Sequence, residues 1–299
     1  MEKNNERSAA ASGIFAIGGN LPVSRLGFGA MRLTGEGVWG PPADKDTAIA
    51  LLRRTQDLGI TLIDTAEAYG PGINESLIAE ALYPYPKDLV IATKGGLQRP
   101  GPNQFYPDGR PLHLRQALEG SLRRLRVDHI DVYQLHYPDP KVPLEDSVGE
   151  IAKMREEGKI RSVGLSNVTF EQLVRAQKIV PIVTVQNHYN LEKPQCVGMD
   201  VQQSAELINL CERQNIGFIP WHPQSIGELA RPGSVLDQIA RRHAAQPGQI
   251  ALAWLLQRSP TILPIPGTSS ISHLEENVES ASIRLSHDEF EEIRRAAQA

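Results

Sequence analysis

The sequence predicts an α/β fold in which eight parallel strands, each followed by a helix, close into a (β/α)8 TIM barrel. The chain has 299 residues, which is the usual length of one such barrel. Short apolar runs rich in β-branched residues alternate along it with longer amphipathic stretches. The alternative, an open doubly wound sheet, agrees less well with eight strands and this length.

The first 22 residues are expected to lie outside the barrel. Residues 1–12 are polar and lack the apolar core of a secretory signal, so we expect a disordered tail. The segment Ile14–Pro22 contains Gly18-Gly19-Asn20 as a turn, which predicts a β-hairpin before the first barrel strand. No linker-like change of composition follows, so residues 13–299 are expected to form a single domain.

The eight barrel strands are predicted from nearly continuous apolar runs, as expected of parallel strands covered on both faces. They are Arg25–Gly29, Thr61–Thr65, Leu89–Thr93, Ile130–Leu135, Ser162–Leu165, Thr184–Gln186, Gly217–Pro220 and Ile262–Ile265. The longest loops are Thr34–Ala43, Gly95–Pro111 and Gln224–Pro232. Each follows a strand, so we expect all three at the carboxyl-terminal rim, where barrel enzymes carry their chemistry.

Helices are predicted from apolar periodicity together with recognisable ends. Glycines follow the helices that end at Leu58 and Glu157, and glycine is the usual residue beyond a helix terminus. A proline opens the helix that begins at Pro247, and Ser286 with Glu289 forms a capping-box pattern. The helices so predicted are Asp46–Leu58, Leu114–Leu125, Leu144–Glu157, Ser204–Gln214, Pro247–Gln257 and one beginning at Ser286.

Composition and charge exclude several classes of protein. The formal net charge is -4 and no basic tract occurs, so neither nucleic acid nor an anionic membrane surface is an expected partner. No apolar window approaches the length of a membrane span. The two cysteines, Cys196 and Cys211, form no metal-binding spacing and no disulfide framework, so we expect no metal and a cytoplasmic location.

Four residues of complementary chemistry stand at or near the ends of neighbouring predicted strands. Asp64, Lys94 and His136 end the second, third and fourth strands, and Tyr69 lies on the loop after the second. Each alone has an ordinary explanation: a helix cap, a surface lysine, a core histidine, an amphipathic rim residue. Because a barrel brings strand ends together, we expect all four to converge.

Together these four side chains suit proton transfer to a carbonyl group. An ammonium near the phenol favours the phenolate and is expected to lower the pKa of Tyr69, while the carboxylate keeps Lys94 charged and fixed. The imidazole of His136 can orient or polarise a substrate carbonyl.

Motifs spread over almost the whole chain resemble those of the aldo-keto reductase superfamily, in the family's order. They are Leu26-Gly-Phe-Gly29, Ile63-Asp-Thr-Ala66 with Tyr69-Gly70, Asn74-Glu75-Ser76, Ala92-Thr-Lys94, Ile130-Asp-Val-Tyr133 with Leu135-His136, Gly164-Leu-Ser-Asn167, Val185-Gln-Asn187 with Tyr189-Asn190, and Ile265-Pro-Gly-Thr268 with Glu276-Asn277. The resemblance implies that Asp64, Tyr69, Lys94 and His136 form the catalytic tetrad. It also implies hydride transfer from a reduced nicotinamide, with Tyr69 supplying the proton.

The resemblance further assigns residues to a nicotinamide cofactor, although the glycine pattern of a Rossmann fold is absent. Ser166, Asn167 and Gln186 match residues that hold the carboxamide. Trp221 stands where the family usually stacks a tyrosine or phenylalanine on the nicotinamide ring.

The adenosine end of the cofactor is matched by Gly267, Thr268, Ser269, Ser270, His273, Glu276 and Asn277. A loop that leads into a helix amino terminus suits a phosphate. Many family members place lysine or arginine there, whereas this chain offers hydroxyls and His273. The resemblance implies NADP(H) as the cofactor, because the family mostly uses it, and the departure from the family's basic residues leaves NAD(H) open.

The substrate pocket is expected to be built from rim residues: Met31, Trp39, Tyr106, Tyr137 and Trp221. Gly37-Val-Trp-Gly-Pro-Pro42 and Gly267-Thr-Ser-Ser270 are among segments similar to a bacterial branch that includes pyridoxal reductases, so pyridoxal is a candidate among small carbonyl substrates. Loops at the rim vary freely and do not fix the substrate. The oligomeric state is not determined, and a monomer is compatible with the sequence.

Two other functions remain open at this point. One is a cofactor-binding regulator with little turnover, as in the channel β-subunits that resemble these reductases and keep the tetrad. The other is an aldolase in which Lys94 forms a Schiff base.

Overall fold

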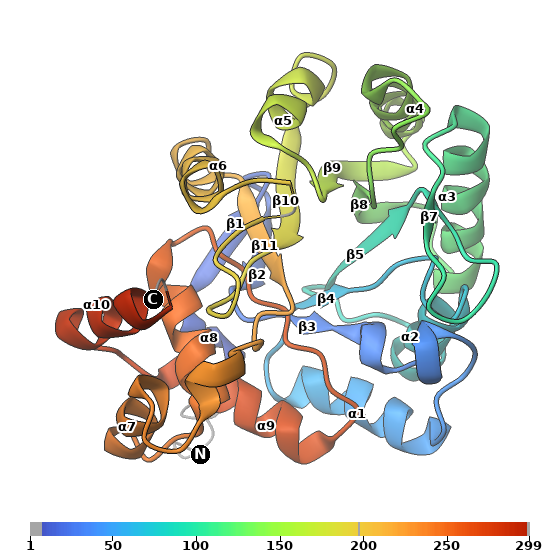
Figure 1. Ribbon diagram of the computed structural model, residues 1–299. Coiled ribbons are helices and arrows are strands. Elements are labelled where there is room, and N and C mark those ends of the chain that lie inside the picture. The colour runs from blue at the N-terminus through green and yellow to red at the C-terminus, as the bar shows by residue number, and fades with distance from the viewer. Residues whose placement is uncertain (1–7, 197, 298–299) are drawn as a thin grey trace.

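A curled sheet of seven parallel strands forms the centre of the molecule (Figure 1). The computed structural model describes residues 8–196 and 198–297. The strand order is β11-β10-β9-β8-β5-β4-β3, so strands that follow one another along the chain are neighbours in space. Their bounds are β3 Phe28–Gly29, β4 Leu62–Asp64, β5 Val90–Gly95, β8 Ile130–Leu135, β9 Ile160–Ser166, β10 Ile182–His188 and β11 Gly217–Trp221.

An extended segment, residues 261–266, lies between the two edges of this sheet in place of the expected eighth strand. On one side Phe218 donates its N–H to the carbonyl of Thr261, at 2.8 Å. On the other side Gly27 donates to the carbonyl of Pro264, at 2.9 Å. A bridge between Phe218 and Ile262 is the only ladder pairing that the described residues make here. The prolines at 264 and 266 explain the short ladder, since they have no N–H to donate.

The predicted hairpin is present at the amino-terminal end of the sheet. β1 (Ile14–Ile17) pairs antiparallel with β2 (Leu21–Ser24). The aromatic ring of Phe15 lies against Gly217, at the start of β11, and Gly18 lies against Val183, near the start of β10. The hairpin therefore covers the end of the barrel opposite to the strand ends that were predicted to carry the chemistry.

The expected disordered tail is wrong for its last residues. Ala9–Ser12 form a short 3-10 helix, and Ala9 is fully buried. The Oγ of Ser12 accepts a hydrogen bond from the N–H of Leu26 at 2.9 Å, so this segment is fixed to the first barrel strand. Small residues can be buried in this way without forming an apolar run. The remainder of the predicted tail, residues 1–7, lies outside the described residues.

Helices surround the sheet (Figure 1). They are α1 Lys45–Asp57, α2 Ile73–Leu82, α3 Pro111–Leu125, α4 Leu144–Glu156, α5 Phe170–Ala176, α6 Val201–Arg213, α7 Val235–Arg242, α8 Pro247–Arg258, α9 Ile271–Glu279 and α10 His287–Ala296. All six predicted helices are present. The predicted loop Gly95–Pro111 contains a further small hairpin, in which β6 (Leu97–Gln98) pairs with β7 (Tyr106–Pro107).

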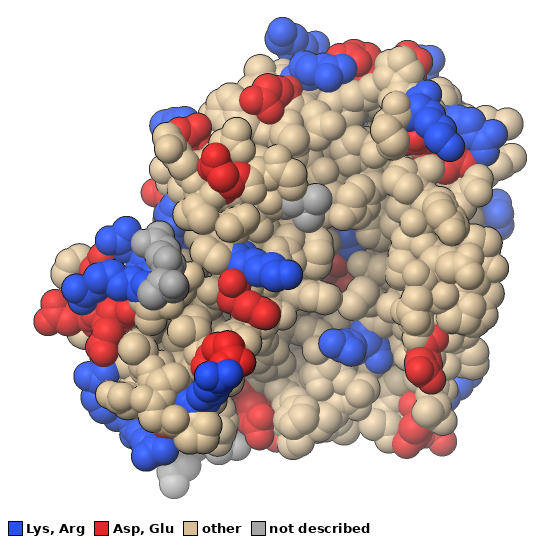
Figure 2. Space-filling model, viewed as in Figure 1, with Lys and Arg blue, Asp and Glu red and all other residues tan. Residues whose placement is uncertain are grey.

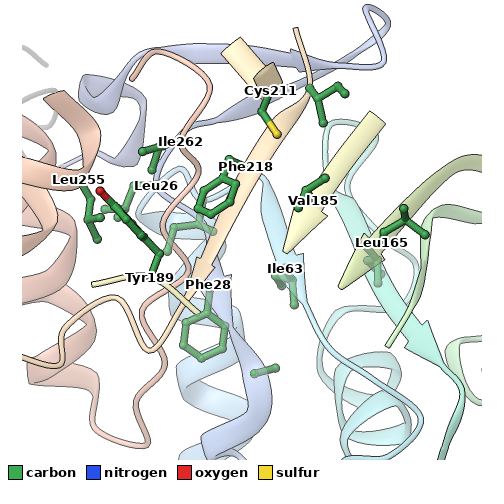
Figure 3. Close-up of a cluster of buried hydrophobic side chains, with 14 of the residues drawn as sticks. Leu26, Phe28, Ile63, Leu165, Val185, Tyr189, Cys211, Phe218, Leu255 and Ile262 are labelled. Atoms are coloured by element: carbon green, nitrogen blue, oxygen red, sulfur yellow. The ribbon is translucent and has the colours of Figure 1, made fainter. Parts of the chain in front are cut away.

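Two apolar layers follow from the alternation of side chains along each strand. The outward layer joins strands and helices, and Figure 3 shows Ile63, Val185 and Phe218 within it. The inward layer includes Leu62, Val90, Val132, Ile219 and Leu263 together with Phe15 of the hairpin. The inner layer fills the barrel near its amino-terminal end, so the interior is packed and carries no open channel there.

Candidate active site

Two residues beyond the inward apolar layer, the same strands place polar side chains in the barrel. Because the side-chain period of a strand is two, Asp64 points inward like Leu62, and Lys94 points inward like Val90 and Ala92. Gln134 on β8 and His136, the residue directly after β8, follow Val132 in the same way. The structure thus brings the predicted strand-end residues together at the carboxyl-terminal end of the sheet.

A buried ion pair forms the base of the site. The Nζ of Lys94 lies 2.6 Å from Oδ2 of Asp64 and donates at 2.8 Å to the carbonyl of Thr65. The other oxygen of Asp64 accepts hydrogen bonds from Nε2 of Gln186 at 2.7 Å and of Gln134 at 3.2 Å. Burial alone lowers the pKa of Lys94, but Asp64 and the phenol of Tyr69 outweigh it, and the pKa is raised. The lysine therefore carries its charge at neutral pH.

Tyr69 lies on the loop between β4 and α2, next to this ion pair. The Nζ of Lys94 is 5.2 Å from the centre of the Tyr69 ring, and the imidazole of His136 approaches the ring edge-on at 5.9 Å between centroids. Burial raises the pKa of Tyr69, and the charge of Lys94 opposes the shift without reversing it. The expected lowered pKa is therefore wrong: the phenol is held in its protonated form.

His136 is held as a neutral imidazole. Burial, followed by the positive charges of Lys94 and Arg99, lowers its pKa well below the ordinary value. Its Nδ1 is buried and has no hydrogen-bond partner among the described residues. Its backbone is fixed by the side chain of Asn167, which donates to the His136 carbonyl at 3.1 Å. A neutral imidazole beside a protonated phenol can share in binding a carbonyl oxygen.

A cavity of about 600 Å³ opens above these residues. Asp64, Tyr69 and His136 lie in its wall together with Met31 and Tyr137, two of the residues predicted for the substrate pocket. Figure 2 shows the face of the molecule hollowed near its middle, with charged side chains inside the hollow.

Two other pocket predictions are not met. Trp39 does not line this cavity, because its ring faces the guanidinium of Arg99, 5.7 Å from the ring centre. Tyr106 points away as well and is 55% exposed. Its neighbours Phe105 and Pro107 line the cavity instead, since adjacent side chains of a strand face opposite ways. The alternation of side chains between the two faces of the β6-β7 hairpin was the signal that could have placed Phe105, and not Tyr106, at the cavity.

The residues assigned to the nicotinamide, three for its carboxamide and Trp221 for its ring, lie around the cavity next to Tyr69. Ser166, Asn167, Gln186 and Trp221 all line it. Asn167 adopts a left-handed backbone conformation with φ of 58°, which turns the chain at the end of β9. Its Oδ1 accepts a hydrogen bond from the indole N–H of Trp221 at 3.0 Å, and His188 packs edge-on against the indole at 4.4 Å. The indole is thereby fixed at the cavity wall.

The predicted adenosine segment continues from the cavity along the start of α9. Gly267 lines the cavity, and the hydroxyl of Thr268 accepts from the N–H of Ser270 at 3.0 Å. Ser270 caps the helix, while Ser269, His273 and Glu276 are exposed and Asn277 is buried. The side chain of Asn277 accepts a hydrogen bond from Gln224 at 2.6 Å. The exposed groups and the first turn of α9 form a polar shelf beside the cavity.

Arg32 is a cavity residue that the sequence prediction did not include. It lines the cavity with Gly267, and its Cγ lies 3.5 Å from the position that a Cβ of Gly267 would take. It is exposed and has no ion pair or hydrogen bond from its side chain to the described residues. Its position directly after the predicted pocket residue Met31 was an available signal. The turn after β3 thus places a cation at the cavity next to Gly267, whereas residues 267–277 contain no lysine or arginine.

Other kinds of site have no support within residues 8–196 and 198–297. No group of three or more histidine, cysteine, aspartate or glutamate residues could hold a metal ion. No helix in that part of the chain is long and apolar enough to cross a membrane. Cys196 and Cys211 are both buried free thiols.

Comparison with known proteins agrees with this geometry. Residues 25–298 match the model of the aldo/keto reductase family. An uncharacterized oxidoreductase of Schizosaccharomyces pombe is 50% identical over 275 residues, covering 92% of this chain and 87% of the relative. The pyridoxine 4-dehydrogenase of Escherichia coli is 40% identical over 285 residues, covering 93% and 96% respectively.

A solved structure gives the same result. The aldo-keto reductase of Klebsiella pneumoniae in complex with NADPH superposes with a TM-score of 0.78 at 26% identity, covering 94% of each chain. The chain therefore belongs to the aldo/keto reductase family of oxidoreductases.

Proposed function

We propose that this protein reduces an aldehyde or ketone to an alcohol with NADP(H), and catalyses the reverse oxidation, with Tyr69 as the proton donor. The observation that carries the proposal is the convergence of three groups at one cavity. The ring of the protonated phenol lies 5.9 Å from that of a neutral imidazole, between centroids, and its centre lies 5.2 Å from the ammonium of a charged lysine paired with Asp64. A carbonyl oxygen needs such a proton donor and a cation nearby when it becomes an alkoxide.

The described residues fit a nicotinamide dinucleotide. The cavity is large enough for the nicotinamide half, and the fixed indole of Trp221 offers a flat apolar wall for its ring. The exposed hydroxyl of Ser269, the half-buried hydroxyl of Ser270 and Arg32, which has no ion pair within the described residues, offer phosphate partners near the amino terminus of α9. NADPH bound in this position supplies the hydride. The NADPH complex of the Klebsiella pneumoniae relative supports the phosphorylated form of the cofactor.

The protein's own residues then handle the proton and the carbonyl oxygen. Tyr69 donates its proton to that oxygen, and the charge of Lys94 stabilises the tyrosinate that remains. His136, held neutral, orients the carbonyl by a hydrogen bond from its ring. Asp64 keeps Lys94 charged and in place. Since Lys94 is protonated and bound to Asp64 and the Thr65 carbonyl, it is a poor amine nucleophile, which argues against a Schiff-base aldolase.

Pyridoxal is the substrate we propose to test first. The wall of the cavity contains Met31, Phe105, Tyr137 and Trp221, which suits a planar aromatic aldehyde. The similarity to the pyridoxine 4-dehydrogenase of Escherichia coli, at 40% identity, supports the same substrate.

The test is the loss of NADPH absorbance, and in parallel of NADH absorbance, with a panel of aldehydes that includes pyridoxal. We expect turnover by the unmodified protein, and a fall of roughly 100-fold to 10,000-fold in kcat for Tyr69→Phe, since that is the range for loss of a general acid. Binding of NADPH, followed by tryptophan fluorescence, should be unchanged in the variant. Undiminished turnover by Tyr69→Phe would remove the proton-donor role. Tight NADPH binding with no turnover on any aldehyde would favour a regulatory protein.

A further inference from the structure

Arg99 joins three separate segments of the rim. It follows β6, and its Nε donates to the carbonyl of Gln104 at 2.8 Å within its own loop. One terminal nitrogen donates at 2.7 Å to the carbonyl of Ala68, and the other at 2.9 Å to the carbonyl of Gly37. Gly37 belongs to the loop after β3 and Ala68 to the loop after β4. A single guanidinium therefore ties the loops that follow three neighbouring strands.

Two contacts of Arg99, one hydrogen bond and one packing contact with an aromatic ring, lie close to the site. The carbonyl of Ala68 belongs to the peptide bond that leads directly into Tyr69. The same guanidinium packs over the ring of Phe105, 3.7 Å from its centre, and Phe105 lines the cavity. Arg99 itself does not line the main cavity. Arg99 thus contacts the backbone next to the proton donor and the ring of Phe105 in the cavity wall, without lining the cavity itself.

The charge of Arg99 has no counterion. Its side chain contacts carbonyl oxygens and the rings of Phe105 and Trp39, and forms no ion pair with any residue of the described part of the chain. The loop of Tyr69 is packed against other charged groups, namely the Lys94–Asp64 pair and the imidazole of His136. The pKa of Tyr69 and that of His136 are shifted first by burial and next by the charge of Lys94, and the charge of Arg99 acts on both groups in the same direction as that of Lys94.

We propose that Arg99 is a positioning residue that ties the substrate loops to the Tyr69 loop and places a second, uncompensated positive charge beside the proton donor. The proposal rests on the proposed carbonyl reduction. When Tyr69 gives up its proton, it becomes an anion within reach of two cations, Lys94 and Arg99. Arg99 contacts neither substrate nor cofactor and acts only through Tyr69 and the loops.

The two roles predict two separable effects. Loss of the tie releases Phe105 and the loop after β3, which raises KM for the aldehyde. Loss of the charge disfavours the tyrosinate, so the reverse reaction, which starts from the tyrosinate, requires a higher pH. A lysine keeps the charge but cannot donate to three carbonyls from a rigid fork. Arg99→Lys therefore separates the effects, and Arg99→Met removes both.

The experiment compares Arg99→Lys, Arg99→Met and Arg123→Met. Arg123 is an exposed residue of α3 whose side chain has no hydrogen bond or ion pair within the described part of the chain, and its variant serves as the control for loss of a charge. We expect KM for the aldehyde to rise roughly tenfold in both Arg99 variants, the size expected when hydrogen bonds to a charged group are lost. The midpoint of the pH profile of alcohol oxidation should rise by roughly one pH unit in Arg99→Met alone. The Kd of NADPH should stay within twofold.

Two results would overturn the proposal. One is an Arg99→Met variant whose KM and pH profile match those of Arg123→Met. The other is an equal pH shift in Arg99→Lys and Arg99→Met, which would remove the role of the charge.

Hydrogen exchange gives a test that needs no turnover. The N–H groups of Gly70 and Asn103 donate to carbonyls of the loop after β3, at 3.2 Å and 2.9 Å. Both should exchange faster in Arg99→Met if the tie exists. Unchanged exchange would contradict the tie. If the unmodified protein turned over no aldehyde, the proposed function would fail while this measurement would still decide the role of Arg99.

Discussion

The two ends of the barrel interior are built from the same strands but differ in chemistry. On β4, Leu62 lies in the inward apolar layer, and two residues later Asp64 accepts three hydrogen bonds from buried polar groups. On β5 the same change separates Ala92 from Lys94. At the amino-terminal end the hairpin closes over the apolar layer, whereas the carboxyl-terminal end opens into the cavity.

This difference shows how one strand can serve stability and chemistry together. Inward residues at the amino-terminal end need only fit in volume, because they contact other apolar side chains. Inward residues at the other end are buried charges and amides, which cost free energy unless each is paired. Their pairing is almost complete within the described residues, and the buried Nδ1 of His136 and Oε1 of Gln134 are among the exceptions. We expect substitutions at the two ends to affect different measurable quantities.

The largest expected effect on stability comes from the apolar end. Leu62→Ala removes a fully buried side chain and should lower the free energy of unfolding by about 2–5 kcal/mol in chemical denaturation. The kcat of the remaining folded protein should stay close to that of the unmodified protein, because Leu62 does not line the cavity. Tyr69→Phe is the matched variant of the other end, with lost turnover and little change in stability. A Leu62→Ala protein that keeps its stability but has a lower kcat would contradict the assignment of stability to the apolar end and of chemistry to the polar end.

A smaller effect is expected at the outer edge of the cavity, from Arg32→Gln. If the guanidinium contacts the diphosphate that NADPH and NADH share, the Kd of both should rise about tenfold, as for loss of a charge-assisted hydrogen bond. Titration of tryptophan fluorescence measures both values, with Arg123→Gln as the control. An increase for NADPH alone would place Arg32 at the 2′-phosphate instead, and no increase for either would remove it from the site.

The smallest expected effect concerns Glu67 and the pH dependence of the free energy of unfolding, which tests whether buried polar groups near the site reduce stability. Burial raises the pKa of Glu67, on the loop before Tyr69, to about 8, although its Oε1 accepts a hydrogen bond from Gly96. Between pH 4.5 and 8 the folded protein holds a proton that the unfolded chain has lost, so stability falls as the pH rises. Glu67→Gln keeps an acceptor for Gly96 but cannot titrate.

Denaturation at pH 5 and pH 8 measures this effect. The unmodified protein should lose at least about 1 kcal/mol more than Glu67→Gln over this interval. Parallel losses in the two proteins would show that Glu67 is not held protonated in the folded state.

The strands and the convergence of Asp64, Lys94 and His136 were predictable because both follow from local rules. Apolar runs located the seven paired strands, and these three residues stand at or next to the ends of such runs, which a parallel barrel brings together. Some helices with recognisable ends were also found, such as α1, which Gly59 follows, and α10, which Ser286 caps. No range was predicted for α2, α5, α7 or α9. For α2 there is a physical reason, because it follows a left-handed glycine, Gly72, and has no side-chain cap.

The features that were missed depend on contacts between distant segments. The ring of Trp39 faces Arg99, and Arg99 is bound mainly to backbone carbonyls. Every residue has a backbone carbonyl, so the sequence does not indicate which carbonyls a side chain will bind. The pKa of Tyr69 was predicted from the charge of Lys94 alone, whereas the depth of burial decides its direction. The eighth strand was predicted from its apolar character, but its prolines restrict the pairing to isolated contacts.

The segment 261–266 closes the barrel against Gly27, so the last piece of the wall joins the first. Almost the whole chain lies between these two partners. During synthesis on a ribosome, the strand that begins the barrel therefore has an open edge until the chain has been made as far as Pro264. Contacts of such long separation form slowly, and an unpaired strand edge invites association with other chains. The growing barrel is therefore open to association with other chains until this closing contact has formed.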